Sequence, residues 1–174
     1  VSLSTSAGDI DAAAITATGN DVTLNAAASI TDGNAAATNI SAANLDATAA
    51  TGIDLDTDTD SITAAVSGTG VVDIDETDAV TLTSVTTADG SITVDAGGTI
   101  TASVVTAGGG DADDDISLAT SAGDIDAAAI TATGNDVTLN AAASVTDGNA
   151  AATNISAANL DATAATGIDL DTDT

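Results

Sequence analysis

Short segments in which aliphatic and polar residues alternate recur along the whole chain. Six of them place one polar residue between two aliphatic ones: Val1–Leu3, Val22–Leu24, Ile53–Leu55, Val72–Ile74, Ile92–Val94 and Ile116–Leu118. Alternation with a period of two, carried mostly by β-branched residues, predicts short β-strands that bury one face. We therefore expect an all-β fold.

Further apolar residues lie in pairs between these segments: Ile10/Ile15, Ile40/Leu45, Ile62/Val66, Val80/Val85 and Ile100/Val105. We interpret each stretch as one turn of a parallel β-helix, or β-solenoid. Its five turns would begin at residues 1, 22, 53, 72 and 92, with lengths of 21, 31, 19, 20 and 24 residues. The long second turn would carry a protruding loop around Asp32–Asn34. Dividing that turn near Ile40 would give six turns instead of five.

The alanine-rich stretch 34–50 could also be helical, because alanine is the best helix former. Its alanines are interrupted by Thr, Asn and Asp, and no apolar stripe keeps a period of 3.6 residues. We favour β-structure for this stretch.

A long internal repeat sets the domain organisation. Residues 1–59 recur as residues 116–174 with three differences, Val1/Ile116, Ser4/Ala119 and Ile30/Val145. The chain therefore holds one unit of 115 residues, 1–115, and the first half of a near-identical unit, 116–174. Such self-similarity is typical of solenoids, in which each unit packs mainly on its neighbours. We expect one continuous solenoid without caps, cut from a longer tandem array, with neighbouring repeats and identical chains as its partners.

The composition restricts the core and the partners. There is no Lys, Arg, His, Cys or aromatic residue, and 27 acidic residues give a formal charge of −27. Such chains are often disordered, but 44% of this chain is hydrophobic, in a regular pattern that fits a narrow solenoid. The lack of basic residues argues against binding nucleic acid or anionic membranes. No apolar run is long enough for membrane insertion.

The residue inventory also argues against an enzyme. No His, Cys, Lys, Arg or Tyr is present to act as a base, a nucleophile or an oxyanion partner. Paired Asp residues could in principle cleave glycosides, but the cationic groups that would hold an acidic sugar are missing. We therefore expect no catalytic residues.

One glycine-containing motif recurs in Ser6–Asp11, Gly19–Ala26 and Asp89–Thr101. It resembles the repeats of filamentous-haemagglutinin-type proteins, the large exported bacterial adhesins of two-partner secretion. The resemblance implies a right-handed parallel β-helix, an extracellular or cell-surface location, and a non-catalytic role as a structural repeat of a fibre, filament or adhesin stalk. The uneven turn lengths and the lack of basic residues depart from that family. The alternative function is a cation-dependent adhesive module for a cell surface, a glycan or ice.

Acidic residues are expected to gather on one part of the surface. When the predicted turns are aligned at their starts, one outward column contains Thr23, Asp54 and Asp73, and the next contains Asn25, Asp56, Asp75 and Asp95. Hard divalent cations favour clustered carboxylate oxygens, and Ca²⁺ tolerates irregular geometry. The expected Ca²⁺ ligands are therefore Asp54, Asp56, Asp73, Asp75 and Asp95, together with Asp58 and Asp60 of the same acidic run and Asp113 and Asp115 after three glycines. A solvated acidic face, screened by salt, and a flexible loop are the alternatives.

Overall fold

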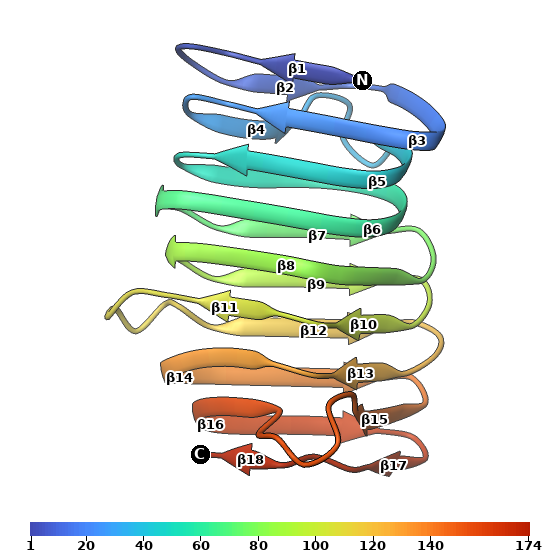
Figure 1. Ribbon diagram of the computed structural model, residues 1–174, viewed down its shortest axis with the longest axis vertical. Coiled ribbons are helices and arrows are strands. Elements are labelled where there is room, and N and C mark those ends of the chain that lie inside the picture. Colours follow the sequence, from blue (N-terminus) through green and yellow to red (C-terminus); the bar gives the residue numbers. More distant parts are fainter.

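The chain forms a flat solenoid whose turns are stacked along one axis (Figure 1). The structure, a computed structural model, describes residues 1–174 and contains strands but no helix. All paired strands run parallel, and each pairs with strands about one turn away in sequence. The predicted all-β parallel solenoid is therefore confirmed, and stretch 34–50 is not helical. The chain forms no apolar helix of membrane-spanning length.

Eighteen strands make up the solenoid. They are β1 (Ser2–Ser4), β2 (Ile10–Ala12), β3 (Ile15–Asn25), β4 (Ser29–Asp32), β5 (Ile40–Ala49), β6 (Gly52–Thr69), β7 (Val72–Glu76), β8 (Val80–Asp89), β9 (Ile92–Ala96), β10 (Ile100–Ala102), β11 (Val105–Ala107), β12 (Ile116–Thr120), β13 (Ile125–Ala127), β14 (Ile130–Ala141), β15 (Ser144–Asp147), β16 (Ile155–Ala164), β17 (Gly167–Ile168) and β18 (Thr172–Asp173).

Each turn contributes strand to two opposite faces. Face A begins with β1 and includes β8, β10, β11, β13 and β15; face B begins with β2 and includes β4, β7, β9 and β12. The longer strands β3, β5, β6, β14 and β16 pass from one face to the other.

The core is a thin layer of aliphatic side chains between the two faces. It forms one cluster of 39 buried residues, all Ile, Leu, Val or Ala. On each face the inward residues stack directly on their counterparts in the next turn. The column on face B is Ile10, Ile30, Ile53, Val72, Ile92, Ile116, Val137 and Leu160. The column on face A is Val22, Leu45, Ile62, Leu82, Ala102 and Ala127.

Glycine allows successive turns to approach closely at one edge. A Cβ atom added to Gly70 would lie 2.0 Å from the Thr51 carbonyl oxygen, and one added to Gly90 would lie 2.2 Å from the Gly70 carbonyl oxygen. Because no side chain fits at these distances, the turn positions at Gly70 and Gly90 require glycine.

The predicted stacking is correct in two blocks and wrong at the junction between them. As expected, the segment that begins at residue 1 stacks on the one that begins at residue 22, and the segments that begin at residues 53, 72, 92 and 116 stack in that order. Val22, however, pairs with Leu45, and Ile53 stacks on Ile30. The predicted column that joined Thr23 to Asp54 is therefore wrong, because these residues lie on opposite faces. The 31 residues from 22 to 53 make one and a half turns, since β4 occupies an additional place on face B.

The extra half turn ends in the predicted loop after Asp32. Buried Asn39 holds this loop: its Nδ2 donates to the Ala12 carbonyl oxygen and to Asp32 Oδ1, both at 2.8 Å. Its Oδ1 accepts a hydrogen bond from the Asp56 backbone N–H at 2.6 Å. Asn154 makes the equivalent contacts in the second unit. Asp32, at the end of β4, and Asp56 of β6 are therefore both hydrogen-bonded to Asn39.

Removal of one core side chain should weaken the whole stack. We expect Ile92→Ala to lower the free energy of unfolding by about 2–5 kcal/mol, because Ile92 is fully buried between Val72 and Ile116. Val104→Ala should change it by less than about 0.5 kcal/mol, because Val104 is 41% exposed. Denaturant unfolding followed by circular dichroism measures both, and equal losses would contradict the ladder core.

Candidate functional site

Five carboxylates lie together on the outer surface of face B. We define this acidic patch as Asp54, Asp56, Asp73, Asp75 and Asp95. Asp54 lies beside Asp73 in the strand register, and Asp75 lies between Asp56 and Asp95. Directly paired residues on neighbouring strands are about 5 Å apart, so like charges face one another here. The structure thus brings these five predicted residues together.

The acidic patch is electrostatically unfavourable when it is fully ionised. Partial removal from water raises the pKa of Asp54, Asp56, Asp73 and Asp95, and repulsion from neighbouring carboxylates raises it further. For Asp54 and Asp56 the strongest repulsion comes from Asp32, the last residue of β4, to which Asn39 is hydrogen-bonded. No basic side chain exists to offset it.

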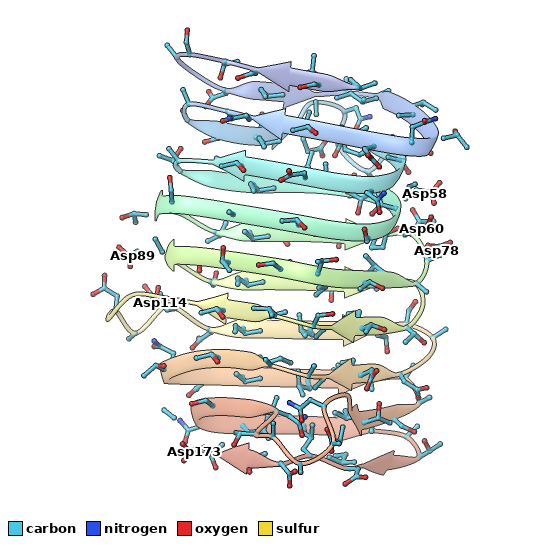
Figure 2. All side chains as sticks on the ribbon, viewed as in Figure 1. Asp58, Asp60, Asp78, Asp89, Asp114 and Asp173 are labelled. Atoms are coloured by element: carbon cyan, nitrogen blue, oxygen red, sulfur yellow. The ribbon has the colours of Figure 1, made fainter.

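A second group of carboxylates lies at the edge where β6 passes from face B to face A. We define this edge cluster as Asp58, Glu76 and Asp78. One carboxylate oxygen from each residue lies within 4.8 Å of the other two. Figure 2 shows Asp58 and Asp78 on the same edge of the solenoid, with Asp60 between them. Asp58 and Asp78 are exposed, whereas Glu76 is only 4% exposed.

Glu76 is the only glutamate of the chain, and its carboxylate occupies an inward position of the ladder, next to Thr57 of the preceding turn. Its Oε2 accepts hydrogen bonds from Thr57 Oγ1 at 2.8 Å, from Thr59 Oγ1 at 3.0 Å and from the Thr59 N–H at 3.1 Å. Its Oε1 accepts one from the Thr77 N–H at 3.0 Å. Burial raises the pKa of Glu76, although these hydrogen bonds act in the opposite direction. The carboxylate thus ties two successive turns together.

The other predicted ligands lie apart. Asp58 and Asp60 leave the acidic patch because β6 turns the edge at this point, and Asp60 is not part of the edge cluster. Asp113 is exposed in the loop before β12, and Asp115 Oδ1 accepts a hydrogen bond from the Asp136 N–H at 2.9 Å. In the structure, only the edge cluster brings three carboxylates within one ion's reach.

Sequence reasoning did not assign Glu76 and Asp78 to a site. The alternation itself carried a signal, because Val72, Ile74 and Glu76 occupy successive inward positions of one strand. An acidic residue at a position of that kind is a buried charge, which requires hydrogen-bond partners. Asp78 belongs to the turn that follows, and only the folding of β6 over the edge brings it to Asp58.

These surfaces offer oxygen ligands and little else. An open hollow of about 410 Å³ lies beside the acidic patch and is lined by Asp75, Asp95, Thr120 and neighbouring residues. Carboxylate and hydroxyl oxygens suit hard cations. Comparison of the chain with protein-family models, with curated proteins and with solved structures found no match.

Mild acid should stabilise the fold. A carboxyl whose pKa is raised on folding binds more protons in the native chain than in the unfolded one, between its ordinary and its raised pKa. Stability therefore falls as the pH rises through that window, and we expect the melting temperature to increase as the pH is lowered from neutral toward the ordinary carboxyl pKa values of 3.8 for Asp and 4.5 for Glu. Thermal melting at constant ionic strength measures this.

Two double variants distinguish the effect of repulsion within the acidic patch from the effect of the chain's net charge on the pH dependence of stability. Asp54→Asn with Asp73→Asn should flatten the pH dependence, whereas Asp111→Asn with Asp113→Asn removes two charges from the exposed loop and should alter it less. Equal effects of the two double variants would contradict a special role of the patch.

Proposed function

We propose that the chain is a structural, non-catalytic segment of an extracellular bacterial fibre, filament or adhesin stalk. The observation that carries this proposal is the continuous parallel strand pairing from one turn to the next, through the first unit and into the second. The resemblance of the repeats to exported bacterial adhesins supports the cell-surface location.

Stiffness would follow from the direction of the main-chain bonds. The 106 backbone hydrogen bonds are dominated by strand pairing between successive turns, so most of them run along the axis. Bending such a rod would stretch many of them on one side, while the aliphatic columns would lose contact. Each added unit lengthens the rod without a new kind of contact.

The adhesive alternative has weaker support. The surface has no aromatic side chain on which a sugar ring could stack, and its hollows are open and lined mostly by acidic, hydroxyl-bearing and small residues. Saturable binding of the isolated chain to cells or glycans would favour adhesion over a purely structural role.

The length of the rod should depend linearly on the number of units. One unit of 115 residues makes five and a half turns in the observed register, and turns are about 4.8 Å apart, so each added unit should add about 26 Å. Small-angle scattering of chains with one to four added units measures the maximum dimension. Growth with the cube root of chain length would contradict the proposed fibre.

Calcium is the proposed cofactor, as a cation that relieves carboxylate repulsion. We expect millimolar CaCl₂ to raise the melting temperature above that in NaCl of equal ionic strength, because bound cations stabilise the folded state. If the double variant Asp58→Asn with Asp78→Asn is no longer stabilised by calcium, the binding site is the edge cluster. If the double variant Asp54→Asn with Asp73→Asn is no longer stabilised, the binding site is the acidic patch. An unchanged melting temperature, with and without chelator, would exclude specific binding.

A further inference from the structure

The 115-residue unit contains an odd number of half turns. On face A the inward segments begin near residues 1, 22, 45, 62, 80 and 100. On face B they begin near residues 10, 30, 53, 72 and 92. Six segments on one face and five on the other make eleven half turns. The second unit must therefore start on the face opposite to the first.

The strand register shows this exchange of faces directly. Thr23 belongs to the column of Ser2 and Asp46 on face A. Its copy in the second unit, Thr138, pairs with Ser117, which pairs with Thr93 in the face B column of Asp73. Residues that are identical in sequence thus point in opposite directions. In Figure 1 the loop after β15 crosses the front of the solenoid, whereas its copy after β4 lies behind it.

The core accepts either unit on either face because both faces present the same kind of column. Ile116 stacks on Ile92 and on Val137, all three fully buried. Most inward positions of both faces are aliphatic, and these aliphatic residues belong to one continuous cluster. A half-turn offset therefore creates no mismatch in the core, and only the outer surface changes sides.

We propose that an array of this repeat is a two-sided rod. Each outer surface of the unit lies on one face of the rod in one unit and on the opposite face in the next unit. The rod's true structural period is two sequence repeats, or eleven turns, which is about 53 Å. The acidic patch illustrates the alternation: Asp54 lies on face B, and its copy Asp169 follows Ile168, which stacks on Val145 on face A.

The alternation has a consequence for partners that rests on the proposed fibre function. A partner that recognises the surface of one unit would be bound on both sides of the same rod. The rod would then link two partners, and it would engage each with several units at once, which strengthens binding without a new contact. A repeat with a whole number of turns would bind along one side only.

Engineered disulfides can test the alternation in this chain, which has no cysteine of its own. Directly paired residues on neighbouring strands have Cα atoms about 4.8 Å apart, within the range that a disulfide can bridge. We expect oxidation to cross-link Thr23→Cys with Asp46→Cys, and Thr93→Cys with Ser117→Cys. It should not cross-link Thr23→Cys with Asp54→Cys within one chain, because these residues lie on opposite faces. Intact mass after alkylation, with reduced samples and single-cysteine variants as controls, gives the readout.

The outcomes separate the alternatives. Cross-linking of both expected pairs and not of the third supports the half-turn offset. An intramolecular bond between positions 23 and 54 would show a whole number of turns and overturn the proposal. Failure of either expected pair would overturn it too, because the offset needs both registers. The scattering measurement on longer chains tests the fibre independently, since a rod forms with either offset.

Discussion

The whole structure depends on the register between one turn and the next. Each backbone N–H and C=O group of a strand needs a partner, and here the partner lies in the neighbouring turn. The same register stacks Ile53 on Val72 and Val72 on Ile92, so hydrogen bonding and core packing are satisfied together. With neither disulfides nor aromatic residues, the chain has no other source of comparable stabilisation.

The acidic exterior is the opposing contribution. The patch carboxylates repel one another because the register that aligns Ile53 with Val72 also aligns Asp54 with Asp73. Because side chains alternate between the two sides of a strand, any shift of register that separated the charged residues would also misalign the core residues. Protonation, salt or bound cations can relieve the repulsion without disturbing the core, since the acidic patch lies outside it.

Glu76 is an exception to the separation of polar exterior and apolar core. Its position in the ladder would suit an aliphatic residue, yet hydroxyl and backbone N–H donors from the preceding turn surround its carboxylate. An uncompensated carboxylate there would be strongly destabilising. Thr57 and Thr59 therefore allow Glu76 to be buried, and together the three residues form the interior of the solenoid at this edge.

The sequence alone determined the fold class, the repeat and most of the stacking. The alternation predicts which side chains face inward, as in Ile92, Thr93 and Val94, because the period of a strand is two. It cannot state on which face of the solenoid a segment lies, since both faces use the same pattern. That choice depends on how many residues each turn takes, and Leu45, not Ile53, proved to be the neighbour of Val22. The edge cluster and the exchange of faces between units were decided by the tertiary structure, because both depend on pairing between segments far apart in sequence.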